Sequence, residues 1–238
     1  MSKPSPDFNI TIPVYEQVNL FDVTSACEMF YWMGQYWTGR TVAIRLVSAN
    51  GCKVSTHAGP ILTPDESFDS FTRKGLQTHL IWVPGAGDDT IAGMMKDQPY
   101  LDFLLAQAQG ADYVTSVCEG ALLLATVGLL DGYTATTHWS VVPCLRQFKN
   151  VRVADDYPRF VVDRNRVTGG GVSSGIDESL GIIRLIAGEQ VAKNAQVVTQ
   201  YFPQPPVMGQ IPCDVKCDLD IPPRAAAKPS ARAGAKKR

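Results

Sequence analysis

One short stretch combines a reactive side chain with an abrupt change of structural pattern. Residues 112–117 (DYVTSV) form a short run typical of a buried strand, whereas residues 119–130 are rich in alanine and leucine, as in a helix. No turn residues separate them, so we expect the chain to turn at Cys118. A nucleophile at such a strand–helix turn is a nucleophile elbow. Amides at the start of the helix favour an anion, so we expect a lowered pKa for the thiol of Cys118.

Three residues of this region have two interpretations each. Cys118 is either this nucleophile or a small buried residue that only packs, as unpaired cysteines often do. Glu119 either points to solvent from the first helical turn or titrates together with the thiol as a coupled pair. His138 is either a structural hydrogen-bonding residue or a neighbour of the thiol.

Two other loops follow predicted strands and carry groups that could act on the same point. Asp22 is either the N-cap of the next helix or a general acid facing Cys118. Gly85 and Ala86 follow a buried strand and open a helix, so their amides, with the amide of Glu119, could hold developing negative charge. The alternative for this glycine-rich loop is turn geometry alone.

These loops require an alternating order of strands and helices. Strand patterns occur at residues 8–15, 42–50, 78–84 and 112–117, with short strands at 151–153, 160–163 and 166–168. Helical patterns lie between them, and a glycine turn at 169–171 opens a helix that we expect to end near Tyr201. The order predicts one α/β domain with a parallel sheet and helices on both faces.

Charge is distributed unevenly along the 238 residues. The net charge of the whole chain is −1, but the last eighteen residues hold six Lys/Arg and no Asp/Glu, which leaves −7 for the first 220. An acidic body of this kind is a poor candidate for nucleic-acid binding. No apolar run is long enough to span a membrane, and because the first residues are polar we expect no signal peptide.

The cysteine spacing and the composition of the two ends predict the state of the thiols and the limits of the folded domain. The six cysteines, at positions 27, 52, 118, 144, 213 and 217, show no zinc-ligand spacing, so we expect reduced thiols, no metal and a cytoplasmic location. Residues 1–7 are predicted to be a flexible arm and residues 8–212 the folded domain. Residues 213–238 are rich in Pro, Ala and basic residues and are predicted to be disordered. The tail is interpreted either as a solvated terminus or as an arm for polyanions.

Several ordered motifs resemble one known family. They are 117–121 (VCEGA), 128–139 (GLLDGYTATTHW), 22–24 (DVT), 83–85 (VPG) and 169–177 (GGGVSSGID), supported by Gln196 and 203–206 (PQPP). This set is similar to the ThiJ/PfpI superfamily of class I glutamine-amidotransferase-like proteins, and most similar to its isonitrile hydratases and to the ligand-binding domains of related transcription regulators.

The resemblance implies a flavodoxin-like sandwich that dimerises and needs no cofactor. In isonitrile hydratases the elbow cysteine attacks the isocyanide carbon and an aspartate acts as general acid and base; these roles fall on Cys118 and Asp22. Water then adds, and an N-substituted formamide leaves. This chain has Glu119 where those hydratases have threonine, and Ser25-Ala26 where they have Gly-Pro.

Two other functions remain open at this point. One is a non-enzymatic sensor in which Cys118 is a redox or ligand switch, since an elbow thiolate is easily oxidised. The other is a glyoxalase-like or amidase-like activity, as in other branches of the superfamily. Because about 26 residues follow the predicted domain, we do not expect a DNA-binding domain after it.

Overall fold

The strands with continuous apolar runs lie at the centre of one seven-stranded sheet. The computed structural model describes residues 7–222. The strand order is β10-β11-β7-β6-β1-β2-β5, and every pair is parallel except β10 with β11. The strands are β1 (Phe8–Pro13), β2 (Val42–Ser48), β5 (Glu66–Ser67), β6 (Leu80–Val83), β7 (Tyr113–Ser116), β10 (Phe160–Asp163) and β11 (Arg166–Gly169). Every residue of β1 and β6 is buried, as expected for parallel strands covered on both faces.

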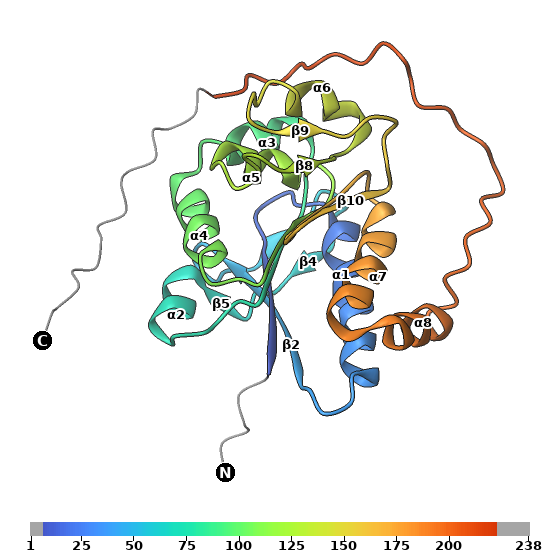
Figure 1. Cartoon of the computed structure of the whole chain (residues 1–238). Coiled ribbons are helices and arrows are strands. Elements are labelled where there is room, and N and C mark those ends of the chain that lie inside the picture. The colour runs from blue at the N-terminus through green and yellow to red at the C-terminus, as the bar shows by residue number, and fades with distance from the viewer. Residues whose placement is uncertain (1–6, 223–238) are drawn as a thin grey trace, which may run out of the picture.

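Helices cover both faces of this sheet (Figure 1). One layer holds α1 (Leu20–Tyr36), α7 (Ser174–Ala187) and α8 (Glu189–Val198), which pack against one another. The opposite layer holds α3 (Asp88–Met94), α4 (Gln98–Ala108) and α5 (Gly120–Thr126). The shorter elements are α2 (Phe68–Arg73), η1 (Trp139–Val141), α6 (Val142–Leu145) and the strand pairs β3 (Val54–Ser55) with β4 (Ile61–Leu62) and β8 (Thr134–Ala135) with β9 (Arg152–Val153). The predicted α/β fold, flavodoxin-like with a parallel-sheet core, is confirmed.

One predicted helix is divided in the structure. The helix expected to run to about Tyr201 ends at Ala187, and a second helix begins at Glu189. Gly188, between them, has φ 94°, a left-handed conformation that glycine adopts without steric cost and that cannot continue a right-handed helix.

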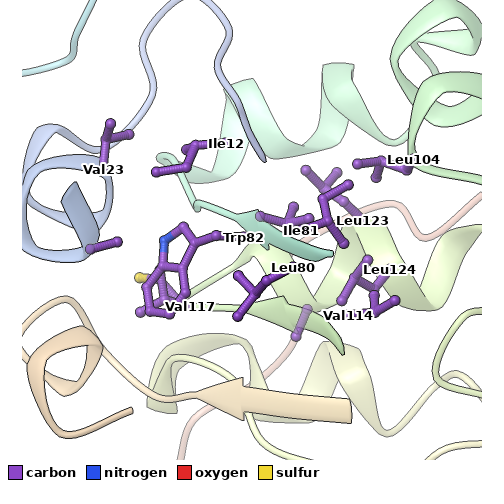
Figure 2. Packing of buried hydrophobic residues seen from close by; sticks show 14 of the residues in the cluster. Ile12, Val23, Leu80, Ile81, Trp82, Leu104, Val114, Val117, Leu123 and Leu124 are labelled. Atoms are coloured by element: carbon purple, nitrogen blue, oxygen red, sulfur yellow. The ribbon is translucent and has the colours of Figure 1, made fainter. Parts of the chain in front are cut away.

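The buried core joins the central strand to both helical layers. Figure 2 shows Trp82 of β6 packed among apolar residues of neighbouring elements, with Val23 of α1 on one side and Leu123 of α5 on the other. The indole Nε1 of Trp82 also donates a hydrogen bond to the backbone carbonyl of Asp22, at 2.9 Å. This bond ties the first turn of α1 to the centre of the sheet, beside the end of β7.

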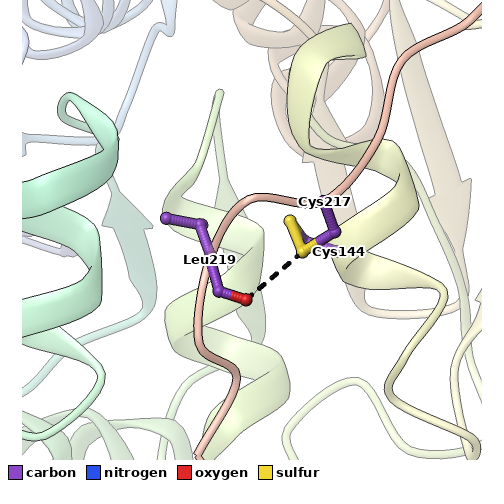
Figure 3. The surroundings of a disulfide bond; sticks show 3 residues. All are labelled: Cys144, Cys217 and Leu219. Carbon is purple, nitrogen blue, oxygen red and sulfur yellow. Dashed lines mark hydrogen bonds between the residues drawn. A yellow bond between two sulfur atoms is a disulfide. The ribbon is translucent and has the colours of Figure 1, made fainter.

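Figure 1 shows the segment after α8 running along the outside of the molecule before it returns to the body near α6. Cys217 of this segment forms a disulfide with Cys144 of α6, and its Sγ lies 3.5 Å from the carbonyl oxygen of Leu219 (Figure 3). Leu219 and Ile221 pack against the core. The expectation that all six cysteines are reduced was therefore wrong, because chain folding brings together two cysteines that are 73 residues apart.

The predicted terminal segments fall only partly within the described residues. Asp7 exchanges hydrogen bonds with Thr41, while the rest of the predicted arm lies outside these residues. Likewise, residues 223–238 of the predicted tail lie outside them, so the domain boundaries remain predictions. None of the helices within residues 7–222 has the length and apolar composition needed to cross a membrane.

Candidate active site

The backbone turns sharply at Cys118, as predicted. Strand β7 ends two residues earlier and α5 begins two residues later. Cys118 has φ 58°, a left-handed conformation that is costly for a residue with a side chain. Two neighbouring segments hold it there: the Cys118 amide donates to the Gly170 carbonyl at 2.9 Å, and the Thr137 hydroxyl donates to the Cys118 carbonyl at 2.7 Å. The nucleophile-elbow geometry is present.

Two glycines allow other segments to approach this turn closely. A Cβ atom at Gly120 would collide with the backbone carbonyl of Val83 on β6. A Cβ atom at Gly85 would collide with the side chain and amide of Glu119. Both positions therefore require glycine for close approach, and the loop after β6 lies directly against the elbow.

Asp22 lies in the first turn of α1, facing the thiol. Its side chain is fully buried, and its Oδ2 accepts hydrogen bonds from the Gly85 amide at 2.9 Å and from the Asn19 side chain at 3.4 Å. The same Asn19 amide lies 3.7 Å from Cys118 Sγ. Because α1 begins at Leu20, the N-cap interpretation of Asp22 was wrong. Its Oδ1 has no hydrogen-bond partner.

Glu119 also belongs to this cluster rather than to the surface. Only 6 % of its surface is exposed, so the interpretation of an exposed first-turn carboxylate was wrong. One oxygen of Asp22, the sulfur of Cys118 and one oxygen of Glu119 all lie within 4.8 Å of one another. Three acidic groups therefore share one buried space.

Burial controls the protonation of these groups. It raises the pKa of Asp22 to about 7, although the hydrogen bond from Gly85 acts in the opposite direction. It also raises the pKa of Glu119. The pKa of Cys118 is raised well above its usual value, first by burial and then by the negative charges of Asp22 and Glu119. The Glu119 amide lowers that pKa, but less strongly.

The predicted lowering of the thiol pKa was therefore wrong, because burial and two carboxylates outweigh the helix start. The cluster retains protons near neutral pH. A thiolate can form when the thiol proton passes to a neighbouring carboxylate, and Asp22 is suited to exchange a proton in this range.

Comparison with known proteins places this geometry in a family. The DJ-1/PfpI family model matches residues 9–185. The chain belongs to the DJ-1/PfpI family. It is 34 % identical over 193 residues to an isonitrile hydratase of Pseudomonas putida, covering 81 % of this chain and 78 % of that protein.

Two further relatives show the range of this family. The HTH-type transcriptional regulator GbdR of Pseudomonas aeruginosa (strain UCBPP-PA14) is 34 % identical over 177 residues, which cover 74 % of this chain and 46 % of the regulator. The crystal structure of a ThiJ/PfpI family protein from Pseudomonas syringae superposes with a TM-score of 0.75 at 30 % identity, covering 87 % of this chain and 84 % of that one. DJ-1/PfpI relatives thus include an enzyme and a regulator.

The remaining predicted residues of this DJ-1/PfpI protein lie around the cluster. The Nδ1 atom of His138 is 3.6 Å from Glu119 and 2.6 Å from the hydroxyl of Ser140, so the residue both borders the cluster and caps η1. Burial lowers the pKa of His138, which favours the neutral ring. The Gly85 amide is engaged by Asp22, and Ala86 pairs with Val18 in an antiparallel bridge.

Sequence reasoning missed two residues that hold the cluster in place. Asn19 contacts both Asp22 and Cys118, and its position three residues before Asp22 at a helix start was an available signal. Thr137 holds the Cys118 carbonyl, and nothing in its spacing indicates this role.

A cavity of about 420 Å³ adjoins the elbow of this DJ-1/PfpI protein. Several of its lining residues already contact the cluster: Gly170 and Thr137 bind the Cys118 backbone, and His138 faces Glu119. The other lining residues are mainly apolar or aromatic: Phe21, Trp139, Tyr157, Pro158, Val172 and Ile211, with Arg159, Gly171, Ser173 and Ser174. Cys118 itself is only 1 % exposed, so a narrow group is best suited to reach its sulfur.

Asp22, Cys118 and Glu119 are also the side chains within residues 7–222 that could together hold a metal ion. Proton transfer among these three side chains is a simpler role for the same atoms than metal binding. Two carboxylic acids with raised pKa values next to a nucleophilic thiol can assist its addition to an electrophile and move the accompanying protons.

Proposed function

We propose that this DJ-1/PfpI protein is a cysteine-dependent enzyme that hydrates an isocyanide to an N-substituted formamide. The observation that carries the proposal is the position of the Asp22 carboxyl group beside Cys118, with one oxygen free of hydrogen bonds and a pKa of about 7. Such a group can give and take a proton at neutral pH, and the proposed reaction requires both.

In the first step, Cys118 Sγ forms a bond to the terminal carbon of the isocyanide. The thiol proton passes to Asp22 and from there to the same carbon, giving a thioimidate in which nitrogen remains doubly bonded to carbon. Thiolate formation and proton transfer to carbon thus use one carboxyl group, and the raised pKa of Asp22 suits this relay.

In the second step, water adds to the thioimidate carbon while Asp22 accepts one of its protons. The carbon–sulfur bond then breaks, sulfur regains a proton, and nitrogen receives the other. The product is the N-substituted formamide, and the enzyme returns to its starting state. The reaction consumes one water and needs no oxidant or reductant. His138, held near the cluster, is proposed to help bind the substrate or the water.

Three further observations support this assignment. The chain is 34 % identical to an isonitrile hydratase over 78 % of that enzyme. The isocyanide group is linear and narrow, which suits a sulfur that is 1 % exposed. The apolar side chains that line the adjoining cavity suit an alkyl or aryl substituent on the isocyanide nitrogen.

Location and assembly are part of the same proposal. We propose a cytoplasmic homodimer that binds a small-molecule substrate and does not bind nucleic acid. The Cys144–Cys217 disulfide would be unusual in that location, since disulfides are typical of oxidising compartments. Light scattering of the purified chain tests the dimer, and non-reducing electrophoresis of rapidly alkylated cells tests the disulfide in place.

A second candidate is a ligand sensor that uses the same pocket without turnover. The similarity to the regulator GbdR favours it. Selective redox sensing is less favoured, because burial and the two carboxylates keep Cys118 protonated and only 1 % exposed. A sensor would bind an isocyanide in stoichiometric amount and release no formamide.

The deciding experiment is a formamide assay on the full chain with a simple alkyl isocyanide. We expect catalytic formamide production by the wild-type protein and at least a 1000-fold loss in Cys118→Ala, with the folded state retained in circular dichroism. Cys27→Ala, which removes another free thiol, is the matched control and should keep full activity. No product from well-folded wild-type protein, or full activity of Cys118→Ala, would refute the enzyme proposal.

A further inference from the structure

The segment that follows α8 reaches back to the cavity beside the elbow. We call residues 202–217 the strap. Ile211, near its middle, lines the 420 Å³ cavity together with Phe21, Trp139 and Tyr157. These residues come from α1, from η1 and from the loop before β10, so the strap supplies a wall that the compact domain does not supply itself.

The strap is fastened at its two ends and weakly held between them. At the near end, the Tyr201 hydroxyl donates to Asp177 at 3.1 Å, and Asp177 also binds Arg159 of the cavity wall. At the far end, Cys217 is bonded to Cys144 (Figure 3). Among the described residues, 203–216 form no hydrogen bond.

Exposure of the strap supports the same conclusion. Met208 is 96 % exposed and Val207 is 78 % exposed, whereas Ile211 is 46 % exposed and borders the cavity. The path of the strap therefore depends on its two fastenings rather than on packing along its length. Removing the disulfide loosens the strap six residues from Ile211 and leaves that end held by the apolar contacts of Leu219 and Ile221.

We propose that Ile211 is a specificity-determining residue for the N-substituent of the isocyanide, and that the Cys144–Cys217 disulfide is the positioning device that holds it in the cavity wall. This inference rests on the proposed hydration reaction. It names the substrate class as isocyanides with a bulky apolar substituent, because the substituent would lie among Ile211, Phe21, Trp139 and Tyr157. A methyl substituent is too small to need the strap.

Hydration of benzyl isocyanide and methyl isocyanide by the full chain tests this inference. In Ile211→Ala and in Cys217→Ser, we expect KM for benzyl isocyanide to rise about tenfold, with KM for methyl isocyanide and kcat for both little changed. Two controls lie on the same strap: Cys213→Ser removes an exposed free thiol, and Met208→Ala removes an exposed apolar side chain. Both should match wild type.

Three results would overturn the inference. Unchanged KM values in Ile211→Ala would remove Ile211 from the substrate site. Equal increases for both substrates would indicate a general loss of structure. An effect in Ile211→Ala without one in Cys217→Ser would refute the positioning role of the disulfide.

A second readout separates this inference from the proposed reaction. Labelling of Cys118 by N-benzylmaleimide and by iodoacetamide is followed by mass spectrometry of the peptide that contains it. We expect Cys217→Ser to speed labelling by the bulky reagent severalfold more than labelling by the small one. If the wild-type protein makes no formamide, the proposed reaction fails, but the ratio of the two labelling rates still tests whether the disulfide holds the strap over the cavity. A ratio that is the same in Cys217→Ser and in wild type would refute that positioning role.

Discussion

The elbow and the strap border one cavity, but they are held in opposite ways. The elbow is surrounded by groups from the start of α1, from the loops after β6 and β11, and from the segment after β8, and each contributes a hydrogen bond or a close contact. The strap is held only at its ends, by the Tyr201 hydroxyl on one side and by the Cys144–Cys217 disulfide with the apolar contacts of Leu219 and Ile221 on the other. Many weak interactions place the nucleophile, whereas few strong ones place the wall that faces the substrate.

The difference matters because the two regions have different tasks. A nucleophile and its proton-exchanging acid need fixed geometry, which a well-packed core supplies. A wall that selects substrates can be altered without disturbing the chemistry, provided that its attachment lies outside the core. Changes in the elbow should therefore affect turnover or folding, and changes in the strap should affect selectivity and stability.

Asp22→Asn should give the largest effect on the elbow. The amide cannot exchange a proton, so we expect turnover to fall by about 10²–10⁴-fold. In the folded protein the pKa of Asp22 is about 7, above its ordinary value of 3.8, so the free energy of unfolding of the wild type decreases as pH rises between these values. The Asp22→Asn side chain does not ionise, so the variant does not lose stability in this way. It should be more stable than wild type by roughly 2–4 kcal/mol at pH 8, and by much less at pH 4, in urea unfolding. A lower stability at pH 8 would contradict the raised pKa.

Gly120→Ala tests whether close approach is essential to the elbow. The new Cβ would collide with the Val83 carbonyl, and neither backbone segment can move freely. We expect a loss of about 3 kcal/mol or more in the free energy of unfolding. Gly93→Ala is the matched control, because a Cβ there meets nothing within 4 Å and alanine favours the helix. Equal stability of the two variants would show that the turn adapts.

Cys217→Ser measures how much the strap contributes to stability. The disulfide closes a loop across a separation of 73 residues, which restricts the unfolded chain. Its loss should lower the free energy of unfolding by about 2–4 kcal/mol, measured without reductant. The variant should still hydrate methyl isocyanide at the wild-type rate. Cys213→Ser should change neither the free energy of unfolding nor the rate of methyl isocyanide hydration. A loss of methyl isocyanide turnover in Cys217→Ser would show that the strap also affects the catalytic step.

Glu119→Gln should give the smallest effect. The negative charge of Glu119 raises the pKa of Asp22, which accepts the thiol proton in the proposed reaction, so its removal should lower that pKa. We expect the acid limb of the pH–activity profile to move to lower pH by about one unit or less. Glu189→Gln, an exposed change on α8, is the control and should not move the limb. A shift to higher pH would show that Glu119 acts as a proton donor instead.

The same comparison explains what could be predicted from the sequence. The position of the elbow follows from a local pattern, since a strand and a helix without loop residues between them force the turn at Cys118. The parallel sheet follows from the alternation of such patterns. The burial of Asp22 and Glu119, and with it the sign of the thiol pKa, depends on which segments cover the elbow, and local spacing does not contain that information.

The strap could not be predicted for a related reason. The composition after residue 202 is rich in proline, which indicates an irregular segment but not its path. Among six cysteines many pairings are possible, and only the folded chain brings position 144 to position 217. The wall of the cavity at Ile211 depends on this pairing.

The disulfide also changes what a cut in the chain does. Residues 203–216 of the exposed strap form no hydrogen bond within the described part of the chain, and such a segment is the kind that proteases cleave first. A single cut there lies between Cys144 and Cys217, so the two fragments remain covalently joined. The cleaved protein would keep its full mass, apart from one added water, until a reductant separated the pieces.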